Sequence, residues 1–130
     1  MDTEELHAAM PLCGLLGMRV STAERETVVL EVDWSASLCT TAGLLHGGAV
    51  MALADSAGAV CAFLNLPEGA TTSTIESKTN FLGAVKDGTI TAAARPLHVG
   101  SSTIVVETEV RRDDGKLVGK VTQTQAVLRR

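Results

Sequence analysis

A stretch of 20 residues from Gly47 to Leu66, GGAVMALADSAGAVCAFLNL, is almost wholly apolar and holds one charged residue, Asp55. A helix of this length could just span a bilayer. This one is built from alanine and glycine, carries an acid in its middle and lacks flanking lysine or arginine. It therefore predicts a helix inside a small soluble protein, with no membrane partner. We expect Asp55 to be buried there, where a carboxylate must be hydrogen-bonded, paired or held for chemistry.

The rest of the chain has the periodicity of strands. Apolar and polar residues alternate from Glu26 to Trp34, which predicts a strand with one buried face. Four more strands are expected over Thr71–Leu82, Gly88–Leu97, Thr103–Val110 and Leu117–Leu128. Arg112–Gly115 has the composition of a hairpin turn, and Thr3 is expected to cap a short helix that ends near Met10. One long helix and five or six antiparallel strands indicate an α+β fold, in a single domain over residues 1–130.

Composition excludes several function classes. A net charge of −4 and an aromatic content of 2% argue against a nucleic-acid partner. The three cysteines are too far apart for zinc ligands or a disulfide framework, which favours a reducing compartment. The start, MDTEELHAAM, is acidic where a secretion signal would be basic and then apolar. We therefore expect a cytoplasmic protein with no metal and no nucleotide-cofactor motif.

The start of the apolar helix and its acid suggest a chemistry. Gly47 and Gly48 are expected at the helix N-terminus, where backbone N–H groups point outward. Asp55 follows Gly48 by seven residues, nearly two turns, so both face the same way about 10 Å apart. Donors that polarise a carbonyl and a carboxylate that activates water, or attacks directly, suit acyl transfer. A structural role for Asp55, bonded to a neighbouring strand, is the alternative, and a second subunit would have to close the cleft.

The segment LHGGAVMALADSAGAV resembles the HGG-x6-D/E signature of the hotdog-fold thioesterases, in particular the phenylacetate-degradation (PaaI-like) acyl-CoA thioesterases. The strands that follow are similar to that family's, so the resemblance covers the chain from Leu15 onward. It implies a hotdog fold, in which an antiparallel sheet wraps round the central helix. It also implies homodimers, often paired into tetramers, with active sites at the dimer interface. Coenzyme A would enter as part of the substrate, and no separate cofactor is implied.

The resemblance assigns roles to four residues. Asp55 takes the position of the nucleophile or general base, and the N–H of Gly48 takes the carbonyl-polarising position. His46 is the histidine of the motif, which orients the loop more often than it transfers protons. Thr40 stands where the family commonly has asparagine or glutamine beside the attacking water.

The resemblance also implies a set of substrate contacts and shows departures. The substrate-binding positions are Gly47, Asn80, Phe81, Leu82, Gly83, His98, Gly100 and Ser101. Gly83 stands where some members place a serine, and Ala59 replaces a helper hydroxyl often found four residues after the acid. His98, Gly100 and Ser101 occupy a turn where relatives often carry arginines for coenzyme A, so Lys78 or Arg95 could serve instead.

Three functions remain in view from the sequence. The first is an acyl-CoA thioesterase that releases a free acid and coenzyme A. The second is a non-catalytic module that binds acyl thioesters, favoured by the departures at Thr40, Ala59 and Gly83. The third is a hotdog dehydratase or hydratase, which is disfavoured because no Pro-Gly-rich turn precedes the helix.

Overall fold

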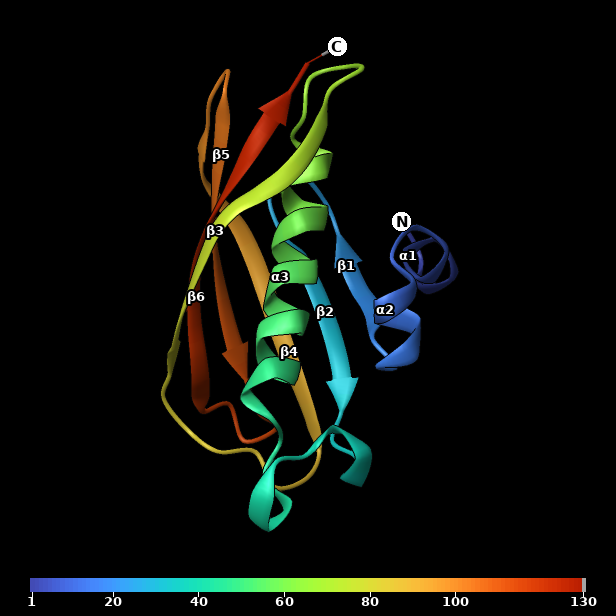
Figure 1. Ribbon diagram of the computed structural model, residues 1–130, viewed down its shortest axis with the longest axis vertical. Helices are drawn as coiled ribbons and strands as arrows, with labels where there is room; N and C mark the ends of the chain where they lie inside the picture. Colours follow the sequence, from blue (N-terminus) through green and yellow to red (C-terminus); the bar gives the residue numbers. More distant parts are fainter. Residues whose placement is uncertain (130) are drawn as a thin grey trace.

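The computed structural model describes residues 1–129, which form one six-stranded antiparallel sheet with a long helix packed on one face (Figure 1). The helices are α1 (Thr3–Ala9), α2 (Pro11–Leu15) and α3 (Gly47–Leu64). The strands are β1 (Arg19–Ala23), β2 (Val28–Asp33), β3 (Thr71–Phe81), β4 (Thr89–Val99), β5 (Thr103–Arg111) and β6 (Leu117–Leu128). Their order across the sheet is β1-β2-β4-β5-β6-β3. This confirms the α+β architecture.

Buried apolar side chains alternate with less buried ones along the central strands. Val28, Leu30 and Val32 of β2 are buried, and in β5 every second residue from Ile104 to Val110 is fully buried. Because successive side chains of a strand point to opposite faces, β2 and β5 each present one apolar face to α3. The hairpin turn at residues 112–115 is also confirmed: Gly115 has a φ of 85°, and its N–H donates to Arg112 O.

Two N-terminal elements, α2 and β1, have no counterpart among the sequence predictions. α2 has five residues, and β1 is an edge strand in which no residue is fully buried. A strand without an apolar face has no alternation to reveal it. The cap of α1 also differs from the prediction. Asp2 caps this helix in a capping box with Glu5, while Thr3 Oγ1 accepts a hydrogen bond from Val20 N across the chain.

Helix α3 lies against the inner face of the sheet and contacts β2 to β6. Its length and mean hydropathy would suit a membrane span, but half of it is buried inside this fold. Gly58, in its middle, lies directly against the side chain of Gln123 from β6, and a Cβ at position 58 would overlap that side chain. A glycine here costs about 1 kcal/mol relative to alanine. The small residue therefore serves the close approach of helix and sheet.

One edge of the sheet is long and open. β3 pairs with β6 on one side over 11 residues and has no strand on its other side within residues 1–129. Its side chains are mostly exposed, including Ile75 (62%) and Phe81 (53%). Because an unpaired edge offers free backbone N–H and C=O groups, it is a natural surface for pairing with another chain.

Candidate active site

Asp55 lies on the exposed side of α3, and the expectation that it is buried is wrong for the single chain. Its neighbours Ala54, Ser56 and Ala57 face inward, so the helical period turns Asp55 toward the space between α3 and β3. There it borders a shallow groove lined by Leu12, Met51, Ala52, Ser56, Thr74 and Ser77. We call this the Asp55 groove.

Two donors hold one oxygen of the Asp55 carboxylate. Thr74 Oγ1 of β3 donates to Oδ1 at 3.2 Å, and Gln123 Nε2 of β6 donates to the same atom at 3.1 Å. Gln125 of β6 supports this arrangement because its Nε2 donates to Thr74 Oγ1 at 2.7 Å. Within residues 1–129, Oδ2 receives no hydrogen bond, and this oxygen is therefore free to act on a bound molecule.

The sequence predictions did not include Thr74, Gln123 or Gln125. A signal was present: both glutamines stand at inward positions of β6, between the buried Val121 and Val127. Polar residues on an otherwise apolar strand face need partners in the core. Which partners they meet depends on the register between β3, β6 and α3, which the local pattern does not specify.

The start of α3 is capped by its own histidine. His46 Nδ1 accepts a hydrogen bond from Gly48 N at 2.7 Å, and a Cβ at position 48 would lie 2.9 Å from the same ring atom. Glycine is therefore needed at position 48, and its N–H is occupied. Gly47 N has no hydrogen-bond partner in the described part of the chain. The open donor at the helix start is thus the N–H of Gly47, not that of Gly48.

Phe81, another predicted substrate residue, lies against Gly47. A Cβ at position 47 would lie 3.2 Å from Cζ of the Phe81 ring. Asn80 precedes it in β3, opposite Lys120 of β6. Leu82 and Gly83 follow the strand, and a Cβ at position 83 would meet the side chain of Lys116 at 3.2 Å. Gly83 thus lies beyond β3, whereas the hydroxyl beside Asp55 comes from Thr74.

Thr40 is exposed and lies outside the groove at the helix start, which is bordered by Leu38, Cys39 and His46 among others. Its backbone N–H donates to Leu44 O in a short turn before the helix. The structure therefore brings the backbone of Thr40 close to the motif without placing its side chain in the groove.

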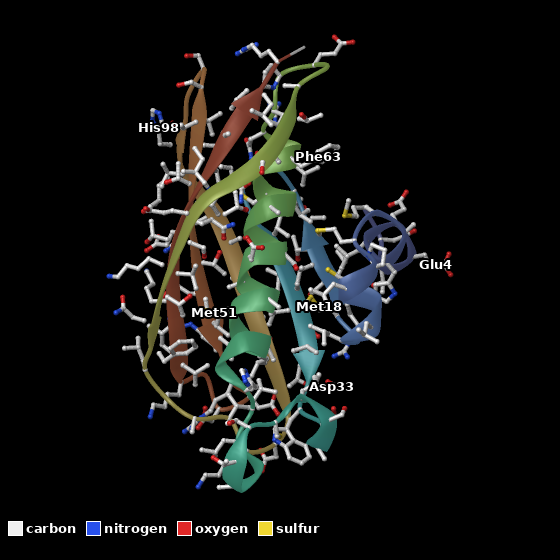
Figure 2. All side chains as sticks on the ribbon, in the orientation of Figure 1. Glu4, Met18, Asp33, Met51, Phe63 and His98 are labelled. Carbon is white, nitrogen blue, oxygen red and sulfur yellow. The ribbon has the colours of Figure 1, made fainter. Side chains whose placement is uncertain are left out.

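The predicted turn for coenzyme A lies far from the helix start. His98 is the last but one residue of β4, and Gly100 and Ser101 lie in the turn between β4 and β5, beside the end of β6. Figure 2 shows His98 near the upper end of the molecule and Met51, which follows the start of α3, well below it. A single chain therefore does not bring these residues together with His46 and Gly47.

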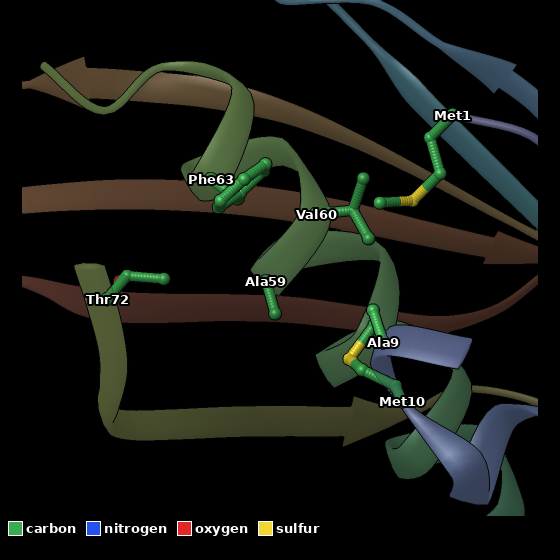
Figure 3. Close-up of a pocket in the computed structure, with 7 residues that line it drawn as sticks. All are labelled: Met1, Ala9, Met10, Ala59, Val60, Phe63 and Thr72. Atoms are coloured by element: carbon green, nitrogen blue, oxygen red, sulfur yellow. The ribbon is translucent and has the colours of Figure 1, made fainter. Parts of the chain in front are cut away.

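An apolar cavity of about 190 Å³ opens one helical turn beyond Asp55 (Figure 3). Its lining comes from α1, α3 and β3, with Met1, Ala9, Met10, Ala59, Val60, Phe63 and Thr72. The hydroxyl of Thr72 donates to Ala126 O at 2.8 Å and is thus engaged within the sheet. The cavity accordingly presents hydrocarbon and thioether groups to whatever enters it.

The described residues form no group of three His, Cys, Asp or Glu side chains that could hold a metal ion. The three cysteines are free thiols, and burial raises the pKa of Cys61 to about 11. Because the thiolate is the reactive form, Cys61 is not a nucleophile near neutral pH. Asp55 is thus the exposed ionisable side chain of α3.

The family model for the thioesterase superfamily matches residues 42–119, which run from the turn before α3 into β6. The chain belongs to this superfamily. A solved member, a mutant thioesterase from Pseudomonas aeruginosa, superimposes with a TM-score of 0.91 at 30% identity, covering 98% of this chain and 94% of that one. This likeness confirms the hotdog fold.

Two curated relatives illustrate the range of the superfamily. A presumed esterase of Vibrio cholerae is 38% identical over 87 residues, which are 67% of this chain and 58% of that protein's length. A 1,4-dihydroxy-2-naphthoyl-CoA hydrolase of Listeria monocytogenes is 27% identical over 109 residues, covering 84% of this chain and 89% of that protein.

Proposed function

We propose that the protein is an acyl-CoA thioesterase, which hydrolyses a thioester to a free acid and coenzyme A. The observation that carries this proposal is the Asp55 carboxylate, held through Oδ1 by two donors while Oδ2 remains free. As a general base, Asp55 takes a proton from water as the water oxygen bonds to the thioester carbon. The tetrahedral intermediate then expels the coenzyme A thiolate, which receives that proton. Direct attack by Asp55, with an anhydride that water later opens, is the alternative route.

The carbonyl oxygen is best placed at the N-terminus of α3. There the N–H of Gly47 is open, and the helix dipole adds positive potential where negative charge develops. We therefore assign the polarising role to Gly47 and give His46 the role of capping the helix through the N–H of Gly48. The PaaI-like assignment rests on the HGG-x6-D motif.

The same helix cannot complete the site by itself. Eight residues separate Gly47 from Asp55, a rise of about 12 Å. Reacting atoms must approach to about 3 Å, so a carbonyl bound at the helix start is out of reach of Asp55 of the same chain. We propose that two copies pair antiparallel across their β3 edges, which places Asp55 of one beside Gly47 of the other. The same pairing moves the turn at His98 toward the partner's helix start, and two such dimers form the tetramer.

The acyl group is proposed to enter the apolar cavity beside Ala59 and Val60. This cavity opens one turn beyond Asp55 along α3, and its lining surface is apolar; the α-ammonium of Met1 pairs with Glu5. Its volume of about 190 Å³ suits a short aliphatic chain or a single aromatic ring. The naphthoyl group in the name of the Listeria relative has two fused rings, so that name supports aryl thioesters as a substrate class and not the fit to this cavity.

A panel of acyl-CoAs tests the function. We expect release of free thiol from short acyl-CoA and aryl-CoA substrates, with kcat/KM at least about tenfold higher than for a dicarboxylic acyl-CoA, because an unpaired carboxylate is costly to bury in an apolar cavity. The measurement is thiol release in steady state. Tight binding of these compounds without release would instead indicate the non-catalytic module, which the position of the Thr40 side chain outside the groove would then explain.

Removal of metals is expected to leave hydrolysis unchanged. The proposed chemistry uses Asp55 and backbone N–H groups, and the described residues hold no metal-ligand cluster. The measurement is kcat/KM before and after dialysis against a strong chelator. Loss of activity that zinc or another divalent ion restores would contradict the mechanism.

The localisation proposed here is the cytoplasm, supported by the free cysteines.

A further inference from the structure

Gln123 lies where the sheet approaches α3 most closely. Its side chain is fully buried, and it crosses from β6 to the helix beside Gly58. The amide group occupies the space that a Cβ of residue 58 would need. Glycine at position 58 is therefore a condition for Gln123 to reach the helix.

The two ends of this amide have unequal surroundings. Nε2 donates to Asp55 Oδ1 at 3.1 Å, but Oε1 is buried and has no hydrogen-bond partner in residues 1–129. A buried carbonyl without a partner is unfavourable, and so is a glycine in the middle of a helix. An aliphatic side chain at position 123 with alanine at position 58 would avoid both penalties. Stability alone thus gives no reason for this pair of residues.

We propose that Gln123 is a positioning residue for Asp55, an inference that rests on the thioesterase function proposed above. An exposed aspartate on a helix has several accessible rotamers. Two donors from different strands, Gln123 and Thr74, fix Oδ1 and so restrict the direction of Oδ2 at the Asp55 groove. Gln123 thereby holds the group that acts on water, without touching the substrate itself.

Gln125 is a matched comparison two residues along the same strand face. Only 1% of it is exposed, and its Nε2 donates to Thr74 Oγ1 at 2.7 Å. Its Oε1 lies 3.2 Å from Thr72 Oγ1 and shares that hydroxyl proton with Ala126 O, so it is not without a donor as Oε1 of Gln123 is. Gln125 reaches Asp55 only through Thr74. Its contribution is therefore expected to be chiefly to stability, in contrast with that of Gln123.

Methionine substitutions of the two glutamines separate these roles, because methionine has a similar shape and no amide. For Gln123→Met we expect kcat to fall at least about tenfold with KM unchanged, since a misdirected carboxylate affects the chemical step more than binding. Its melting temperature should be equal to or higher than that of the unsubstituted protein. For Gln125→Met we expect a melting temperature several degrees lower and a smaller loss of kcat.

Alanine at position 58 gives a second, independent measurement. With Gln123 present, Gly58→Ala should displace the amide and lower both kcat and the melting temperature. In a Gln123→Val background the same change should raise the melting temperature and cause no further loss of kcat. Non-additivity of this kind is the signature of two residues that act through one contact.

The outcomes distinguish the two proposals. Absence of thiol release from the unsubstituted protein across the acyl-CoA panel would refute the thioesterase. The melting temperatures need no turnover: if Gln123→Met melts several degrees below the unsubstituted protein, Gln123 is a structural residue and the inference is overturned. Full kcat in Gln123→Met on an active protein would overturn it as well.

Discussion

Replacing Asp55 by asparagine is expected to lower kcat for acyl-CoA hydrolysis by at least about 10²-fold, the usual scale for loss of a general base. Asparagine keeps the side-chain oxygen that accepts from Thr74 and Gln123, but it can neither take a proton from water nor attack a carbonyl. Because the side chain is exposed in the single chain, the melting temperature should change little. Thiol release and thermal melting are to be measured on the same sample.

Two variants control this experiment. Asp55→Glu should keep part of the activity, because the motif accepts either acid at this position. Glu26→Gln removes an exposed carboxylate from the turn between β1 and β2, at the other edge of the sheet, and should leave kcat and melting unchanged. If Asp55→Asn instead melts several degrees lower and keeps its activity per folded molecule, Asp55 is a structural residue and the proposed chemistry is wrong.

Replacing Ile75 by aspartate is expected to separate the proposed dimer and to abolish most of the activity. Ile75 lies on the β3 edge, is 62% exposed and stands at a bulge between Thr74 and Glu76. A charge on this edge opposes pairing with a second copy. Without the partner, the donor at Gly47 and the base at Asp55 no longer share a carbonyl. We expect a loss of about 10²-fold in kcat/KM, the scale for removing an oxyanion donor.

Light scattering at micromolar concentration measures the mass, and thiol release measures the activity. Ile75→Val, which keeps an apolar side chain, should remain oligomeric and active. The fold of the separated chain is checked by its melting curve, because an exposed residue contributes little to the core. A monomer with full activity, whether of the unsubstituted chain or of Ile75→Asp, would refute a site shared between two copies.

Sequence periodicity predicted the parts of the fold that face the core. The long helix, five of the strands and the turn at Gly115 are where apolar spacing and turn residues indicate, because burial of one face dictates those patterns. β1 has no buried face and left no such pattern. The motif predicted the positions of His46, Gly47 and Asp55. It did not predict that the N–H of Gly48 donates to His46 Nδ1, because this hydrogen bond depends on the geometry of the helix cap.

The partners of Asp55 lie beyond the reach of local patterns. Thr74 is 19 residues away along the chain and Gln123 is 68. Only the order of the strands brings β3 and β6 together and then places both beside α3. The predicted burial of Asp55 failed for a related reason: an apolar helix on the concave side of a sheet has one side that its own chain leaves uncovered.

The placement of β3 beside β6 also has a consequence during synthesis. β3 emerges from the ribosome directly after α3, but its partner strand begins 36 residues after the end of β3, at Leu117. Until β6 is made, both edges of an 11-residue strand are unpaired, which is the condition under which nascent chains aggregate. The many threonine and serine residues of β3, TTSTIESKTNF, keep this segment polar while it waits. Because Gln123 belongs to β6, the pairing of β6 with β3 also brings Gln123 to Asp55. A nascent chain therefore has no complete carboxylate site before its sheet is complete.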